Sequence, residues 1–199
     1  MTVEISTVGH STHQFEIFLS LLQRQGVTAI ADVPSVPYSR FNPQFNREVL
    51  RRALKVHGIQ YVFLGKELGA LSDDECCYVE GKVQYKLLAK TPLFQSGLTR
   101  VIIGAEIQKI ALMCAEKDPL DCHRTILVAR ELIKRGANIT HILQDGSTEL
   151  HRDAVCRLIA KMGLDEGDMF RSEELTAEDA LDKQSNRIAY DRKNAVERQ

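Results

Sequence analysis

Long hydrophobic runs are missing from this sequence. Its longest apolar stretches, such as Ile110–Ala115, are far shorter than the roughly 20 residues that a helix needs to cross a bilayer. The first residues also lack the basic region and the long apolar stretch of a secretory signal peptide. The sequence therefore predicts a protein that has no membrane partner.

An excess of one charge is also missing. The 199 residues include 26 lysines and arginines and 27 aspartates and glutamates, which leaves a net charge of −1. Such a chain has no overall field to attract nucleic acid, so nucleic-acid binding would need a local basic patch. One candidate lies near Arg40, where an expected helix carries Arg47, Arg51 and Lys55 on one face. A solvated helix face and contact with nucleic acid or phosphate both explain this stripe.

Cysteine pairs of the C-x-x-C kind are absent. The five cysteines fit no disulfide framework, so they indicate free thiols in a reducing compartment, and we expect a cytoplasmic protein. Seven residues separate Cys114 from Cys122. This spacing matches neither a structural zinc knuckle nor a thioredoxin-like pair. We therefore predict no cofactor. Zinc held by Cys114, Cys122, His123 and His10 stays an alternative.

Short apolar, β-branched runs alternate with helical patterns along the chain. The runs expected to form strands are 3–8, 27–33, 59–64, 109–114 and 139–143. The later stretches expected to form helices are 46–57, 82–90, 92–107, 125–135 and a stretch that ends at 162. This alternation predicts an α/β protein with a mostly parallel sheet of about five strands and helices on both faces.

The chain is expected to divide into two parts. Residues 1–164 are long enough to form a single α/β domain with a sizeable core. Residues 165–199 form an extension in which 16 of 35 residues are charged. Apolar and aromatic residues interrupt these charges, among them Leu175, Ala180, Leu181, Ile188 and Tyr190. A peripheral helix is therefore expected there rather than a disordered tail.

Polar residues collect where the expected strands end. His10 and Ser11 follow the first strand, and Asp32 ends the second. Glu116 and Asp145 follow the fourth and the fifth strand. In an open parallel sheet, the carboxyl ends of the strands lie along one rim, and ligands bind there. We therefore expect these residues to lie at one rim.

The segment from Cys114 to Arg124 is the strongest functional candidate. Cys114 stands where a strand stops, and Asp121 is expected to cap a helix whose first turn holds Cys122, His123 and Arg124. The helix dipole and cationic neighbours would stabilise a thiolate there. The same turn offers backbone N–H groups and a guanidinium to an anion. Nucleophilic chemistry, acid–base chemistry through His123, anion binding and purely structural roles all stay open.

Several short motifs occur together in this chain. They are Thr7-Val-Gly-His-Ser11, Asp32-Val33, Pro37-Tyr-Ser-Arg-Phe-Asn-Pro-Gln-Phe-Asn46, Tyr61, Leu68-Gly69, Cys114-Ala-Glu116 with Cys122-His-Arg124, and His141-Ile-Leu-Gln-Asp-Gly146 with His151. In this combination the chain resembles the family called domain of unknown function 488. The resemblance implies a Rossmann-like three-layer sandwich and leaves the reaction open. It also implies an arginine after Asp32-Val33, where this chain has Pro34.

The sequence favours an enzyme that acts on a phosphorylated or nucleotide-like substrate at the carboxyl ends of the strands. The candidates for catalysis are His10, Asp32, Cys114, Glu116, Cys122 and His123. The candidates for binding substrate or anion are Ser11, Arg40, Asn46, Arg124 and Asp145. Two alternatives remain: a nucleic-acid or nucleotide-binding module without catalysis, and a metal-dependent enzyme that uses the Cys/His cluster.

Overall fold

The structure of the protein is a computed structural model that describes residues 2–164 and 172–193. Residues 1, 165–171 and 194–199 lie outside the described part, and with them lie two portions of the expected C-terminal extension.

The described residues form one six-stranded sheet in the order β3-β2-β6-β1-β7-β8. Its strands are β1 (Glu4–Gly9), β2 (Ala29–Asp32), β3 (Gln60–Phe63), β6 (Ile110–Cys114), β7 (Asn138–Ile142) and β8 (Thr148–Leu150). All neighbours are parallel except β8, which pairs antiparallel with β7. β2 and β6 are buried at every residue, as expected for inner strands that helices cover on both faces. The expected α/β fold is confirmed, and β8 adds a short strand that the sequence pattern did not predict.

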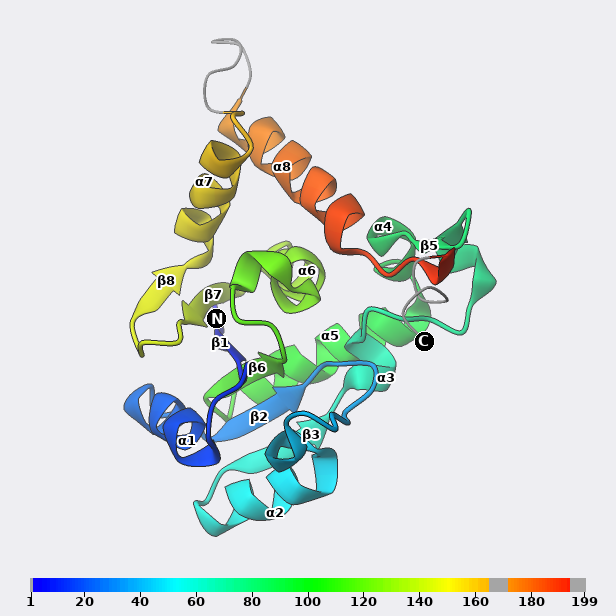
Figure 1. Cartoon of the computed structure of the whole chain (residues 1–199). Helices are drawn as coiled ribbons and strands as arrows, with labels where there is room; N and C mark the ends of the chain where they lie inside the picture. The colour runs from blue at the N-terminus through cyan, green and yellow to red at the C-terminus, as the bar shows by residue number, and fades with distance from the viewer. Residues whose placement is uncertain (1, 165–171, 194–199) are drawn as a thin grey trace.

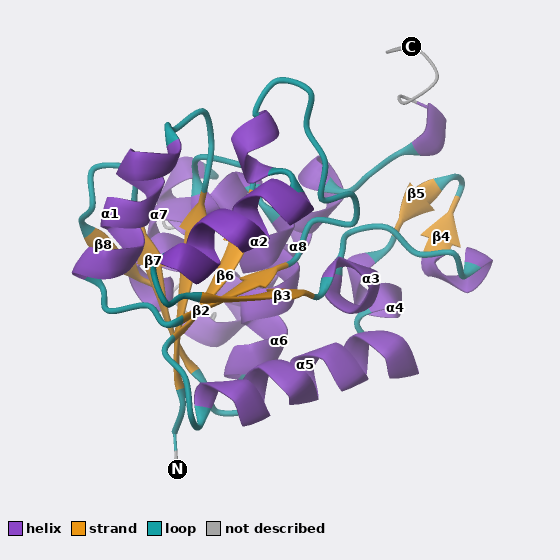
Figure 2. Ribbon diagram, turned by 90° about the horizontal axis from the view of Figure 1, so that it is seen from below, coloured by secondary structure: helices purple, strands orange, loops and turns teal. Residues whose placement is uncertain are grey.

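Helices cover both faces of the sheet and make three layers (Figures 1 and 2). One face carries α1 (Phe15–Arg24) and α2 (Arg47–Val56). The opposite face carries α5 (Pro92–Ala105), the π-helical segment Arg124–Ala129 with α6 (Arg130–Ile133), α7 (His151–Lys161) and α8 (Glu173–Ile188). None of the helices in residues 2–164 and 172–193 is both long and apolar enough to span a membrane.

Strand side chains alternate between these two helical layers. In β6, Ala111 and Met113 pack on the side of α1 and α2, whereas Leu112 and Cys114 pack on the side of α5 and α6. The same alternation in β2 turns Ile30 toward α1 and α2. The alternation therefore decides on which face of the sheet each functional candidate lies.

Residues 65–90 contain more short elements than the sequence pattern predicts. These are α3 (Gly65–Leu68), α4 (Tyr85–Leu88) and a hairpin of β4 (Tyr78–Val79) and β5 (Lys82–Val83). Glu80 and Gly81 both have positive φ, 52° and 88°, which closes a tight hairpin turn. Lys82 and Val83 consequently belong to a strand, and the helix expected over 82–90 is confined to α4.

α8 covers the layer that contains α6 and α7. Ser172 caps its first turn, since the Ser172 side chain accepts a hydrogen bond from the Leu175 amide. Ala180 and Leu181 are buried in the core. The Arg130 guanidinium, which is nearly buried, forms ion pairs with two carboxylates of α8, those of Glu178 and Asp182.

Candidate functional site

The functional candidates separate between two cavities on opposite faces of the sheet. His10 and Asp32 line a cavity of about 330 Å³ on the side of α1 and α2. His123 lines a second cavity of about 580 Å³ on the other face, beside the buried thiols of Cys114 and Cys122. Glu116 lines both cavities, because it follows β6 at the rim of the sheet.

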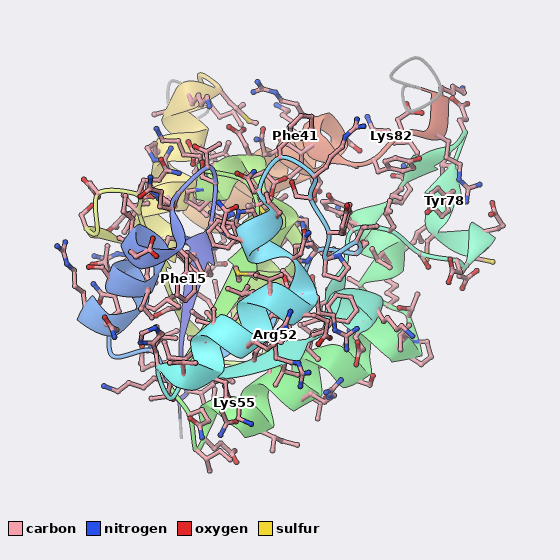
Figure 3. The ribbon with its side chains drawn as sticks, turned by 60° about the horizontal axis from the view of Figure 1, so that its bottom comes forward. Phe15, Phe41, Arg52, Lys55, Tyr78 and Lys82 are labelled. Carbon is pink, nitrogen blue, oxygen red and sulfur yellow. The ribbon has the colours of Figure 1, made fainter. Side chains whose placement is uncertain are left out.

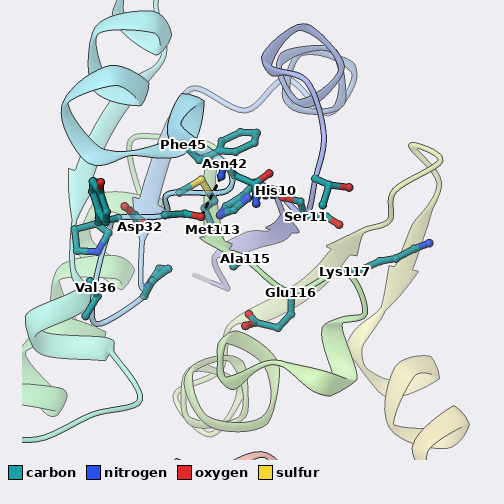
Figure 4. Close-up of a pocket in the computed structure, with 15 residues that line it drawn as sticks. His10, Ser11, Asp32, Val36, Asn42, Phe45, Met113, Ala115, Glu116 and Lys117 are labelled. Atoms are coloured by element: carbon teal, nitrogen blue, oxygen red, sulfur yellow. Dashed lines mark hydrogen bonds between the residues drawn. The ribbon is translucent and has the colours of Figure 1, made fainter. Parts of the chain in front are cut away.

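His10 forms part of the wall of the first cavity (Figure 4). Its ring stacks on Phe45, with 4.2 Å between the ring centroids. The His10 Nδ1 atom lies 2.9 Å from the carbonyl oxygen of Ser11, which can only accept, so Nδ1 carries the hydrogen. Burial lowers the pKa of His10. At neutral pH the ring is therefore neutral, and its Nε2 atom can accept a proton or a hydrogen bond.

Asp32 lies at the end of β2 and is only 1 % exposed. The Tyr61 hydroxyl donates a hydrogen bond to Asp32 Oδ2, whereas the buried Oδ1 has no partner among the described residues. Burial raises the pKa of Asp32 to about 6, although the hydrogen bond from Tyr61 opposes the shift. A carboxyl with this pKa exchanges a proton readily near neutral pH, as a general acid or base must.

The loop of residues 34–46 borders the first cavity. The Asn46 Oδ1 atom accepts a hydrogen bond from the Ser39 amide at 2.7 Å, and Ser39 Oγ accepts one from the Asn42 amide at 3.1 Å. Asn46 precedes α2, but its side chain makes no capping bond because the loop uses it. Pro34, at the position where the resemblance implies arginine, lines the cavity and brings no charge to it.

Two thiols, an imidazole and a carboxylate meet beyond the end of β6. The thiols of Cys114 and Cys122 donate hydrogen bonds to the same oxygen, Glu116 Oε2, at 3.0 and 3.1 Å. The Nδ1 atom of His123 lies 3.6 Å from Cys114 Sγ and 3.9 Å from Cys122 Sγ. The two sulfurs and this nitrogen all lie within 4.8 Å of one another, which is close enough to hold a metal ion.

Cys122, rather than Asp121, caps the helix that follows. Pro119–Asp121 form a 3₁₀ turn, and Cys122 is extended, with φ −132° and ψ 139°. The carbonyl of Cys122 accepts hydrogen bonds from the amides of Thr125 and Ile126, and its Sγ atom accepts one from the Arg124 amide at 3.4 Å. The expected cap at Asp121 is therefore wrong by one residue. The thiol of Cys122 points at the positive end of the helix.

The two thiols differ in their tendency to ionise. Burial and the neighbouring thiol of Cys122 raise the pKa of Cys114 well above its ordinary value. Burial opposes ionisation of Cys122 as well, but the hydrogen bond with Cys114 and the charges of Arg124 and His123 prevail and lower its pKa. If one thiol of the pair ionises, it is therefore Cys122.

Arg124 holds the backbone of the site and lines neither cavity. Its side chain is completely buried, and it donates hydrogen bonds to the carbonyls of Glu116 at 2.8 Å and Lys117 at 3.4 Å. Gly9 makes room for this arrangement, because a Cβ atom at Gly9 would lie 2.0 Å from the Glu116 carbonyl oxygen. The buried guanidinium therefore positions the backbone of Glu116.

The C-terminal segment supplies one wall of the second cavity. Residues 187–191, directly after α8, line it together with Tyr85, Asp121 and His123. The Gln184 side chain fixes α8 to the site by donating hydrogen bonds to the Leu120 carbonyl at 2.8 Å and to Asp121 Oδ1 at 3.1 Å. This wall lies about 70 positions further along the chain than the cluster, so local sequence patterns do not reveal it.

Two other candidates, Arg40 and Asp145, lie apart from the two sites. Arg40 is exposed and lies over the ring of Phe41, 5.4 Å from its centroid. Asp145 is exposed in the turn before β8 and accepts hydrogen bonds from the amide and the hydroxyl of Ser147. Ser11 does line the first cavity, in a turn where its φ is 47°.

The basic stripe of α2 is partly neutralised by the helix itself. Arg51 forms an ion pair with Glu48 at 2.9 Å, and Arg47 lies over the ring of Phe63, 4.8 Å from its centroid. Arg52 and Lys55 project from the outer surface of α2 (Figure 3). The stripe is therefore an exposed helix face next to the loop that borders the first cavity.

Two residues of the first site are not among the residues that the sequence indicates for catalysis or binding. Tyr61 reaches Asp32 because β3 pairs with β2 in a register that aligns Tyr61 with Ile30. Lys117 lines the cavity and follows Glu116 directly. The register between β2 and β3 brings Tyr61 to Asp32, and this register becomes known only from the fold.

Comparison with known proteins confirms the family that the chain resembles. The model of the family described as Domain of unknown function DUF488 matches residues 14–130, which include Asp32 and the whole segment from Cys114 to Arg124. Neither the curated proteins nor the solved structures contain a match to this chain. Since the family match covers more than half of the 199 residues, the protein belongs to the family described as Domain of unknown function DUF488.

Proposed function

We propose that this protein is an enzyme that binds a small phosphorylated or nucleotide-like substrate in the first cavity and transfers a proton through Asp32. The observation that carries the proposal is the environment of this carboxyl: it is buried, it has a pKa of about 6, and its Oδ1 atom lacks a partner among the described residues. Strongly shifted carboxyls that border cavities are typical of active sites.

The second proton-transfer group is His10. Its Nε2 atom is free to accept, because Nδ1 is committed to the Ser11 carbonyl. Asp32 and His10 line the same cavity, as an acid–base pair requires, and their pKa values are shifted in opposite directions relative to their ordinary values. In this proposal the protonated form of Asp32, whose population falls as the pH rises above about 6, donates to the substrate, and the neutral His10 accepts.

The remaining lining of the cavity suits a phosphorylated substrate. Ser11 and Thr12, whose hydroxyls can bind phosphate oxygens, line it, whereas the side chain of Lys117 extends away from the other lining residues (Figure 4). Tyr38, which is 69 % exposed, borders the opening and offers a ring face on which a nucleobase can stack. A volume of about 330 Å³ is at the lower end for small-molecule sites. A mononucleotide-sized ligand is therefore favoured over a polymer.

Turnover in a broad screen of phosphate esters and nucleotides tests this proposal. Asp32→Asn keeps an oxygen for the Tyr61 hydroxyl but cannot exchange the proton, so we expect turnover to fall by about 10²- to 10⁴-fold. Asp145→Asn, which alters an exposed carboxylate remote from the cavity, is the matched control and should leave turnover unchanged. Equal turnover in Asp32→Asn and the wild type would refute the assigned role.

We also propose the cytoplasm as the location of the protein. All five cysteines are free thiols, and the paired thiols of Cys114 and Cys122 both bind Glu116 as S–H donors. This arrangement persists only in a reducing compartment.

A further inference from the structure

We propose that Cys114, Cys122 and His123 bind one thiolate-preferring divalent metal ion, zinc foremost, at a site separate from the Asp32 cavity. The inference does not depend on the proposed proton transfer. It depends on the positions of three ligand atoms, on the orientation of His123 and on the carboxylate that contacts both sulfurs.

The distances between the two sulfurs and the imidazole nitrogen are close to those of a zinc site. In a tetrahedral site with Zn–S bonds of about 2.3 Å and Zn–N bonds of about 2.0–2.1 Å, sulfur and nitrogen lie about 3.6 Å apart. The Nδ1 atom of His123 lies 3.6 Å from Cys114 Sγ and 3.9 Å from Cys122 Sγ. The two sulfurs lie within 4.8 Å of each other, and an ion would bring them to the separation of about 3.8 Å that a tetrahedral site requires.

His123 is oriented as a metal ligand requires. Its Nε2 atom lies 3.2 Å from the carbonyl oxygen of Val33, which can only accept, so Nε2 carries the hydrogen. When the ring is neutral, as a metal ligand must be, its lone pair is on Nδ1, which faces the two sulfurs. Metal-binding histidines usually donate their other N–H group to a carbonyl or a carboxylate in this way.

Charge also favours an ion here. Cys114 and Cys122 are 2 % and 1 % exposed, so two thiolates would be costly to bury without a cation. A divalent ion, two thiolates and a neutral imidazole form a neutral complex. When an ion binds, both thiols lose the protons that they donate to the Glu116 carboxylate in the metal-free chain.

Three protein ligands leave one coordination position, which is the pattern of catalytic rather than structural zinc. Glu116 contacts both sulfurs and also lines the two cavities. It is the group that would hold a water or a substrate at that position. The spacing of seven residues between the cysteines does not oppose such a site, because Cys114 ends β6 and Cys122 begins a helix.

Metal analysis and cobalt binding test the site on the full chain. The purified wild type should contain about one zinc ion per chain. After chelation, Co²⁺ should give a thiolate charge-transfer band and the intense visible bands of a four-coordinate ion. Cys122→Ser and His123→Ala should lose both signals, whereas Cys156→Ser, which alters an exposed cysteine, should keep them. Glu116→Gln should keep the ion but weaken its binding by about 10- to 100-fold.

The wild-type measurements decide the matter even if a variant fails to fold. No metal in the purified chain together with no cobalt bands in the reduced chain would overturn the proposal, as would a Cys114–Cys122 disulfide in freshly purified protein. Asp32→Asn should retain the metal signals in full. The two proposals can therefore fail separately. A metal-free but active wild type would overturn the metal site and leave the proposed enzyme standing, whereas a metal-loaded wild type whose turnover equals that of Asp32→Asn would do the reverse.

Discussion

Asp32 ends a strand that is buried along its whole length, so the ionised carboxylate has lost its water without gaining a cationic partner in contact. The pKa of the Asp32 carboxyl is about 6 in the folded chain against an ordinary value of 3.8. Because folding raises the pKa, the neutral form is favoured in the fold. The associated stability is fully present below pH 3.8 and is lost as the pH rises through about 6.

We therefore predict that Asp32→Asn stabilises the protein at neutral pH. The difference of about two pH units corresponds to roughly 3 kcal/mol of unfolding free energy, an upper figure for a substitution that keeps the Tyr61 hydrogen bond. Urea unfolding of both proteins, on either side of the pH window from 3.8 to about 6, measures it. The gain should vanish at the acidic end. A gain independent of pH would contradict the explanation.

Gly9 supplies a second prediction at the scale of one residue. A Cβ atom there would lie 2.0 Å from the Glu116 carbonyl oxygen, which is backbone and cannot simply rotate away. We expect Gly9→Ala to lower the free energy of unfolding by about 1–3 kcal/mol. Gly104→Ala is the control, because its Cβ atom meets only the flexible end of Ile110. Unchanged urea unfolding of Gly9→Ala would show that the backbone at Glu116 yields freely.

At the scale of elements, the long periodic segments were predictable and the short ones were not. The five parallel strands and α5 follow from apolar runs and from the helix-compatible Pro92. β8 and the β4–β5 hairpin involve two or three residues per strand, too few for any periodic signal. Pairing partners and positive φ angles, not composition, stabilise these elements.

The location of the candidate site was predictable from the sequence, but the division of its residues between two faces of the sheet was not. The rim of the sheet follows from parallel strands, yet the split between two faces depends on the parity of each residue in its strand. Cys122 replaces Asp121 as the helix cap because Asp121 is engaged by Gln184 of α8. Arg124 is committed to the carbonyls of Glu116 and Lys117. Both facts depend on contacts that no local pattern encodes.

The attachment of α8 gives a prediction at this scale. Arg130 is 6 % exposed and pairs with Glu178 and Asp182, which are themselves partly exposed. Arg130→Ala would remove the cation that joins Glu178 and Asp182 and leave Asp182 paired with Lys86 alone, so we expect a loss of about 1–3 kcal/mol, less than for a fully buried pair. Amide hydrogen exchange should accelerate in α8 but not in β1. Lys183→Ala, which removes an exposed side chain of α8, should leave this exchange unchanged.

At the scale of the whole molecule, the C-terminal segment completes a site that begins 70 residues earlier. The family match ends at residue 130, whereas residues 187–191 line the second cavity beside His123. α8 buries Ala180 and Leu181 against the core and so carries this segment across the cluster. The two cavities are therefore formed by different parts of the chain. The first is lined by strand ends and loops of the α/β domain, whereas part of the second is lined by the C-terminal extension.

The fold also sorts the five cysteines, which allows a test of the whole arrangement. Cys76 and Cys156 are exposed, whereas Cys77, Cys114 and Cys122 are buried. With a chelator present, so that no bound ion protects the cluster, we predict that a chromogenic disulfide reagent titrates two thiols rapidly and three only in denaturant. Removal of residues 172–199 deletes Leu181, whose burial is worth roughly 1.5–3 kcal/mol.

Reaction of the thiols of Cys114 and Cys122 in that truncated chain should therefore accelerate by at least about tenfold. Lys183→Ala, which keeps α8 in place, should retain the slow phase of the wild type. Slow amide hydrogen exchange in β1, a central strand of the sheet, reports whether the truncated chain still folds. Slow exchange in β1 with fast cluster thiols supports a covering role for the extension. Five slow or five fast thiols in the wild type would contradict the burial that both proposals use.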